Sequence, residues 1–143
     1  VFQDYQLIPD KTIEENIALA LDIVSYPKKN LHHQIDEVIR KVNLTTRRFL
    51  YPSQLSGGEL QRASLARALA IDPAIILADE PTGNLDLENT WRLIKLLKDI
   101  NQTTKTTIIM TTHNSDIIDS LDKRVIFLRD GMVEKEINHQ QKQ

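Results

Sequence analysis

Several residue types and patterns are missing or scarce in this chain of 143 residues. Cysteine is absent, which excludes disulfides and thiolate metal sites. The formal net charge is only −2, so no global basic field is available to hold nucleic acid or an anionic membrane. No apolar run approaches the roughly 20 residues that span a bilayer. What remains, 41% hydrophobic and 27% charged residues, is typical of a soluble globular domain.

The two ends of the chain also lack expected features. The chain begins with Val1 rather than methionine, and no basic or apolar leader region follows. Residues 1–3 read as a strand already under way, which favours a sequence truncated upstream. At the other end, residues 138–143 are polar, and we expect them to fray.

The first half of the chain has apolar residues at helical spacing. The first helix is expected to open at the capping-box pattern of Thr12 and Glu15. Pro27 closes that stretch, and Pro73 stops the last helix. The expected helices cover about 12–24, 31–42 and 57–70.

The second half has the α/β pattern of short apolar strands alternating with helices. Strands are expected at 74–78, 106–111 and 124–128, with helices at 87–100 and 115–121 between them. Strands that are apolar on both faces indicate a parallel sheet covered by helices on both sides. Asp130-Gly131 predicts a tight turn into a last strand at 132–137.

The segment Leu55-Ser56-Gly57-Gly58-Glu59 stands at the start of a predicted helix. One interpretation is a capping box, because Ser56 and Glu59 have the required spacing. Capping does not explain two glycines in the first helical turn, where each costs up to about 1 kcal/mol relative to alanine. Glycines there would let an anion approach the exposed N–H groups at the positive end of the helix dipole. A phosphate site and a simple cap both remain open.

Two acids, Asp79 and Glu80, follow the apolar strand at 74–78. A strand whose end simply emerges into solvent would look the same. In open α/β sheets, however, ligands bind outside the carboxyl ends of the strands. Asp79 could hold Mg²⁺ there, and Glu80 could orient or deprotonate a water that attacks a γ-phosphate.

Three further residues indicate a functional site only when they are considered together with the motifs that precede and follow them along the chain. Asp86 follows a turn-rich loop and could simply cap the next helix. His113 ends a strand at the sheet edge expected for Asp79 and Glu80, where an imidazole could hydrogen-bond a phosphate or a water. Gln3, taken in isolation, carries no signal.

Taken together, these motifs resemble the ABC ATPase family over nearly the whole chain. The resemblance identifies Gln3 with the Q-loop, residues 55–59 with the signature and residues 75–79 with the Walker B strand. It implies catalytic roles for Glu80, His113 and Gln3, and metal binding by Asp79 and Gln3. ATP binding would fall to Ser56, Gly57, Gly58, Glu59 and the D-loop residue Asp86.

The resemblance implies a P-loop NTPase fold: a RecA-like core with a mostly parallel sheet and an inserted helical subdomain. Residues 1–9 would end the first core segment, 10–72 form the signature subdomain, 73–137 continue the core and 138–143 form the tail. ATP and Mg²⁺ would be bound between the subunits of a head-to-tail homodimer. The P-loop pattern Gly-x-x-x-x-Gly-Lys-[Ser/Thr] does not occur in these residues. We therefore expect a fragment that is inactive alone, with apolar sheet surface left uncovered.

Within the family, Ala-Asp-Glu-Pro-Thr-Gly-Asn-Leu-Asp is similar to the branch of the FtsE, LolD and MacB ATPases. Residues 2–16 and 112–126 favour the cell-division type, which implies an FtsX-like permease as partner and a peripheral position on the cytoplasmic face of the inner membrane. The partner surface is expected at residues 6–16 with the second helix, lined by Tyr5, Leu7 and Ile8; the alternative is that these three residues only pack the core of the helical subdomain. A lipoprotein-release or export ATPase is the alternative. A soluble chromosome-maintenance ATPase is less favoured, since no long heptad arms occur and no nucleic acid is expected as partner.

Overall fold

The structure is a computed structural model that describes residues 1–138, with residues 139–143 left out. The polar tail expected at 138–143 therefore lies almost wholly outside the described residues. The chain forms two compact units, one of residues Val1–Thr111 and one that begins at Thr112. Each unit is described by itself below. The boundaries expected from the family at residues 9 and 72 stay a prediction.

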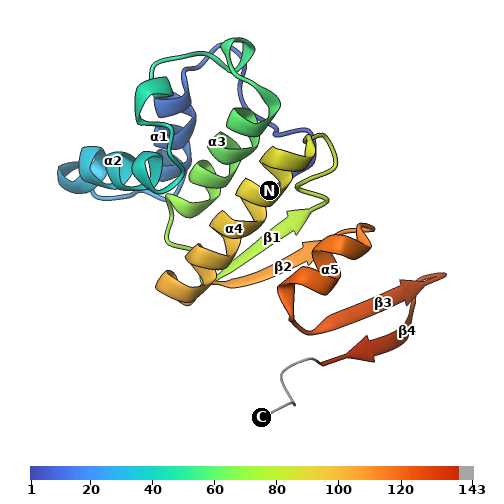
Figure 1. The fold of residues 1–143 in the computed structure, drawn as a ribbon. Helices are drawn as coiled ribbons and strands as arrows, with labels where there is room; N and C mark the ends of the chain where they lie inside the picture. The colour runs from blue at the N-terminus through green and yellow to red at the C-terminus, as the bar shows by residue number, and fades with distance from the viewer. Residues whose placement is uncertain (139–143) are drawn as a thin grey trace. The chain divides into compact units, whose positions relative to one another are not determined.

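Three helices form the first part of the N-terminal unit (Figure 1). They are α1 (Ile13–Ile23), α2 (Leu31–Lys41) and α3 (Gly57–Leu69). Thr12 caps α1 and Ser56 caps α3, each with a glutamate three residues later that completes a capping box. The predicted helices are thus confirmed to within a few residues. In the part of the chain that the structure describes, no helix is long and apolar enough to cross a membrane.

The three helices enclose one apolar core, because each turns its hydrophobic stripe toward the other two. Burial of these side chains is the main stabilising contribution, at about 25 cal/mol per Å² removed from water. The residues of this core with less than 2% exposure include Ile13, Ile17, Leu21, Ile35, Val38, Ile39 and Leu65.

Two parallel strands, β1 (Ile75–Asp79) and β2 (Thr107–Thr111), follow the helices. They are joined by α4 (Leu87–Thr104), which packs against β2 and against α3. The helix buries Leu93, Ile94, Leu97 and Ile100, and β1 buries Ile76 and Ala78. The parallel pairing with a helical crossover confirms the expected arrangement and brings the carboxyl ends of both strands to one edge.

Within residues 1–111, no helix covers the opposite face of these strands, whereas a sheet covered on both sides was expected. Ile75, Leu77 and Ile109 are 55%, 64% and 55% exposed. Successive strand residues point to opposite faces, so these side chains lie on the other face from the buried Ile76 and Ala78. This bare apolar face agrees with the expectation of uncovered sheet surface in this stretch of chain.

The first residues run beside β1 without forming an assigned strand. The backbone nitrogen of Val1 donates to Leu77 O at 2.7 Å, and Asp79 N donates to Val1 O at 2.9 Å. This is the hydrogen-bond pattern of a parallel pair, limited to one residue. The strand expected at residues 1–3 is therefore not formed, and only Val1 pairs with β1. This pairing places Gln3 near the end of β1.

The second unit contains α5 (Ser115–Leu121) and an antiparallel hairpin of β3 (Val125–Arg129) and β4 (Met132–Ile137). Asp130 and Gly131 form the turn with φ values of 50° and 77°, as the Asp-Gly pair predicted. In the described residues of this unit, β3 pairs with β4 in an antiparallel two-stranded sheet. A two-residue turn permits immediate antiparallel pairing, whereas a parallel neighbour needs a crossover.

Candidate functional site

Asp79 and Glu80 lie at the carboxyl end of β1. Asp79 is the last strand residue and is exposed. Glu80 has a φ of 40°, so the chain turns sharply after Asp79. The turn continues through a hydrogen bond from Gly83 N to Glu80 O at 3.0 Å. Both carboxylates therefore emerge at the edge where α/β sheets bind ligands.

Gln3 is held against the loop that follows Glu80. Its side-chain nitrogen donates to Asn84 Oδ1 at 3.2 Å, and Asn84 Nδ2 donates to Gln3 O at 3.1 Å. A Cβ atom on Gly83 would stand 2.6 Å from Gln3 Nε2, so glycine permits this close approach. The structure thus brings Gln3 to the turn beside Asp79 and Glu80, although the residues are more than 75 positions apart.

Two side chains of α3 fix the backbone around Gln3. Gln61 Nε2 donates to Phe2 O at 3.2 Å. Arg67 donates to Gln6 O at 2.6 Å and to Tyr5 O at 3.3 Å. Tyr5 and Gln6 have φ values of 65° and 50°, a left-handed pair that costs about 1–2 kcal/mol per residue outside glycine. The two hydrogen bonds from Arg67 stabilise this strained turn and thereby attach the segment that contains Gln3 to α3.

The N-terminus of α3 is a complete capping box. Ser56 Oγ accepts from Glu59 N at 3.4 Å, and Ser56 N donates to Glu59 Oε2 at 2.9 Å. The bond from the Ser56 backbone, with a smaller contribution from Arg47, lowers the pKa of Glu59 to about 2. Arg47 donates to Glu59 Oε1 at 2.9 Å and offsets the negative charge. The helix start can therefore still attract an anion.

The two signature glycines have close neighbours within the chain. A Cβ on Gly58 would lie 2.5 Å from Asn89 Oδ1 of α4, and a Cβ on Gly57 would lie 3.0 Å from the Tyr5 hydroxyl. Burial raises the pKa of that Tyr5 phenol. Close packing against α4 and Tyr5 is thus a second reason for glycine at positions 57 and 58, in addition to the approach of a ligand. The sequence did not suggest this reason.

Asp86 is the N-cap of α4, as the position of this residue before a predicted helix suggested. Its Oδ1 accepts from Asn89 N at 2.8 Å and its Oδ2 from Asn89 Nδ2 at 2.8 Å. These two bonds, the backbone one first, lower the pKa of Asp86. Because Asn89 also lies against Gly58, one amide side chain connects the aspartate of the loop to the start of α3.

The first unit therefore brings together most of the residues that the sequence singled out. Asn84 bonds Gln3 at the turn that follows Asp79 and Glu80, and Asn89 bonds Asp86 and lies against Gly58 at the start of α3. His113 belongs to the second unit.

The residues that sequence reasoning missed are those that hold the others in place. The sequence motifs assign no role to Asn84, Gln61 or Arg67. The only sequence feature that could have revealed the helix residues among them is a polar side chain on the buried side of a predicted helix. Gln61, with 0% exposure, shows it most clearly.

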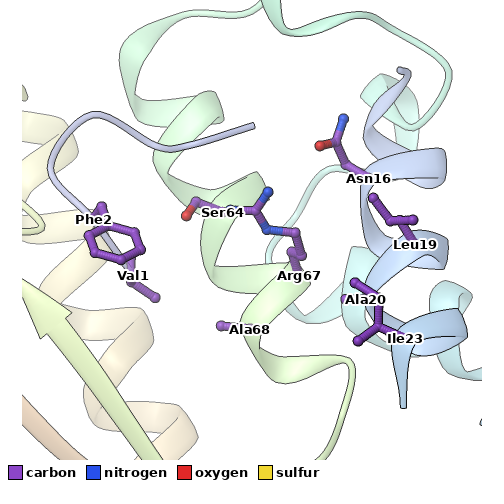
Figure 2. Close-up of a pocket in the computed structure, with 9 residues that line it drawn as sticks. All are labelled: Val1, Phe2, Asn16, Leu19, Ala20, Ile23, Ser64, Arg67 and Ala68. Carbon is purple, nitrogen blue, oxygen red and sulfur yellow. The ribbon is translucent and has the colours of Figure 1, made fainter. Parts of the chain in front are cut away.

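A separate pocket of about 380 Å³ lies between α1 and α3 (Figure 2). Arg67 lies along one side, and apolar side chains of α1 lie opposite. The pocket is distinct from the strand-end cluster. The residues that line it are Val1, Phe2, Asn16, Leu19, Ala20, Ile23, Ser64, Arg67 and Ala68.

Several known proteins are similar to this chain in sequence and in fold. Residues 1–83 match the family model described as ABC transporter. The cell division ATP-binding protein FtsE of Streptococcus pneumoniae is 46% identical over 133 residues, which cover 93% of this chain and 57% of that protein. The methionine import ATP-binding protein MetN of Brucella abortus is 43% identical over 136 residues, covering 95% and 37%. The solved dimer of the ATP-binding cassette MJ0796 with ADP and phosphate superposes with a TM-score of 0.81 at 35% identity, covering 97% and 61%.

The chain belongs to the ABC transporter family of ATP-binding cassettes, because the family match spans more than half of its length. Among named relatives it is similar to the cell division protein FtsE, and it spans about 57% of that protein's length. The P-loop NTPase fold class expected from the sequence is confirmed by the solved cassette.

Proposed function

We propose that the complete gene product containing this chain binds and hydrolyses ATP as the motor subunit of an ABC complex. The observation that carries the proposal is that Asp79 and Glu80 lie at the end of β1, beside the turn at which Asn84 holds Gln3. The relatives named as ATP-binding proteins support it. By itself, the 143-residue chain is proposed not to turn over ATP, because it has no P-loop pattern to hold the phosphates.

The residues at this edge fit Mg²⁺ bound together with a nucleotide rather than in a cage of protein ligands. Among residues 1–138, no group of three or more His, Cys, Asp or Glu is placed to hold a metal. Mg²⁺ commonly takes one or two carboxylates and completes its shell with phosphate and water. Asp79 and the Gln3 amide would supply the protein ligands, and the ion would neutralise charge on the phosphates.

The remaining residues receive roles from their positions. Glu80 would accept the proton of the attacking water, and His113 would hydrogen-bond the γ-phosphate or that water. The N–H groups at the start of α3, with Ser56 as cap, would face the nucleotide of a second subunit in a head-to-tail dimer. Asp86 and Glu59 would stabilise that contact. The dimer of the MJ0796 cassette supports this arrangement.

We propose the cell-division type within the family, acting with an FtsX-like membrane partner at the cytoplasmic face of the inner membrane. The identity to FtsE proteins of several bacteria supports it, as do the segments 2–16 and 112–126. A methionine-import role is the second candidate, since MetN is 43% identical. Lipoprotein release or export remains an alternative on the sequence pattern. An adjacent gene for a four-span membrane protein would favour the cell-division role.

We propose that the partner docks at the pocket between α1 and α3. The surface was expected around Tyr5, Leu7 and Ile8, but Leu7 packs against the buried core. Phe2 and Ile23, at 54% and 75% exposure, are the apolar groups accessible at the pocket. A coupling segment of a permease with apolar side chains would bury them.

Ile23→Glu is expected to weaken co-purification of the membrane partner at least about tenfold, because a charge would be buried at the contact. ATP turnover of the isolated complete gene product should stay within about twofold. Ile71→Glu is the matched control, since Ile71 is exposed but lies outside the pocket. Equal partner capture by the two variants would contradict this docking site.

The proposed enzymatic function is tested by phosphate release from the purified complete gene product with ATP and Mg²⁺. Steady turnover that stops when Mg²⁺ is chelated is the expected result. A product that binds ATP tightly but releases no phosphate, with or without its membrane partner, would contradict the function.

A further inference from the structure

The hydroxyl of Thr111 lies at the carboxyl end of β2, directly opposite the last residue of β1. In the parallel register, Thr111 pairs with Asp79. Paired residues of neighbouring strands point to the same face of a sheet, so the hydroxyl and the carboxylate meet. Thr111 Oγ1 donates a hydrogen bond to Asp79 Oδ1 at 2.7 Å.

The same hydroxyl is also bonded to the next residue of β1. Its oxygen accepts a hydrogen bond from Glu80 N at 2.9 Å. A threonine hydroxyl has one proton to donate and two lone pairs that accept, so both bonds can exist together. The bond to Asp79 fixes where the proton points, and this leaves a lone pair for the Glu80 amide.

The bond to Glu80 stabilises an unusual backbone conformation. Glu80 has a φ of 40°, in the left-handed region that non-glycine residues rarely adopt. The direction of the Glu80 side chain depends on this turn. A side chain on β2 therefore orients one acid through its carboxylate and the next acid through its backbone.

We propose that Thr111 is a positioning residue for ATP hydrolysis, which holds the Asp79 carboxylate and the Glu80 turn in the arrangement their roles need. The inference rests on the proposed function of Asp79 and Glu80. Thr111 itself is not assigned a contact with the nucleotide. A simple end cap of β2 would have the same bonds but no effect on the metal requirement.

Three variants of the complete gene product separate these roles. Thr111→Val keeps the β-branched shape and removes the hydroxyl. Thr111→Ser keeps the hydroxyl. Thr107→Val is the matched control, because Thr107 lies at the other end of β2, opposite Ile75, and is also exposed.

Thr111→Val is expected to raise the Mg²⁺ concentration for half-maximal hydrolysis about threefold to tenfold, and to lower kcat by a similar factor. ATP binding without Mg²⁺, measured by calorimetry, should not change. The Glu80 amide, followed by NMR hydrogen exchange, should exchange faster because it loses its acceptor. Thr111→Ser should restore all three properties, and Thr107→Val should match the unmodified protein.

The proposal is overturned if Thr111→Val shows the Mg²⁺ dependence and Glu80 exchange of Thr107→Val, or if only its melting temperature falls. Failure of the proposed function itself is distinguishable, because the unmodified protein would then lack Mg²⁺-dependent turnover. That result would also remove the positioning role.

Discussion

Glu80→Gln is expected to reduce ATP turnover of the complete gene product by about 10²–10⁴-fold, the usual contribution of general-base catalysis. The substitution keeps the size of the side chain and removes its ability to accept a proton from water. Glu80 N bonds to Thr111 through the backbone, so the turn after β1 should survive. ATP binding is expected to stay within about twofold, measured by calorimetry next to phosphate release.

Glu88→Gln is the control for this variant. Glu88 lies on the first turn of α4, is exposed, and forms its ion pair with Arg92 one turn later. An exposed pair of this kind contributes little to stability, about 0.3–0.5 kcal/mol. The control should therefore hydrolyse ATP normally. Near-normal turnover in Glu80→Gln would remove Glu80 from the role of catalytic base.

Ser56→Asp is expected to abolish ATP-dependent dimerisation while each subunit still binds ATP. Aspartate is as good an N-cap as serine, but its carboxylate would lie beside Glu59, whose Oε2 accepts from Ser56 Oγ at 3.0 Å, so the folded fraction of the variant is checked by thermal melting. The introduced carboxylate would oppose a phosphate brought to the helix start by the second subunit. A substitution at Gly58 would be less informative, because its Cβ would strike Asn89 inside the same subunit.

Thr12→Asp is the matched control, since Thr12 and Glu15 form the same capping box at the start of α1. That helix start is not assigned a phosphate. Sedimentation of both variants with ATP should find a dimer for Thr12→Asp and a monomer for Ser56→Asp. A normal ATP-dependent dimer of Ser56→Asp would refute the proposed contact across the subunits.

The features predicted best from the sequence are those governed by neighbours along the chain. Both capping boxes correctly predicted where α1 and α3 begin. In each box, two side chains three residues apart hydrogen-bond the backbone N–H groups of one another. The Asp130-Gly131 turn was equally local. The acids after β1 could be placed because strand ends in parallel sheets share an edge.

The features that sequence reasoning missed depend on residues far apart in the chain. Gly58 was interpreted only through a ligand, whereas Asn89 lies against it from another helix. Thr111 looked like one more β-branched strand residue until its register with Asp79 was known. Uncovered sheet surface was expected only because the P-loop pattern does not occur, since Ile75 and Leu77 themselves are as apolar as buried residues. Such contacts leave no periodic pattern in a single sequence.

Under the proposed function, two copies of the protein sandwich ATP between the strand-end acids of one and the α3 start of the other. The most direct test of this arrangement is the mass of the Glu80→Gln complete gene product by light scattering, with Mg²⁺ and either ATP or ADP. A doubled mass is expected with ATP only, and no doubling is expected when Ser56→Asp is added to the same chain. An unchanged mass with ATP, or an equal doubling in the double variant, would contradict it.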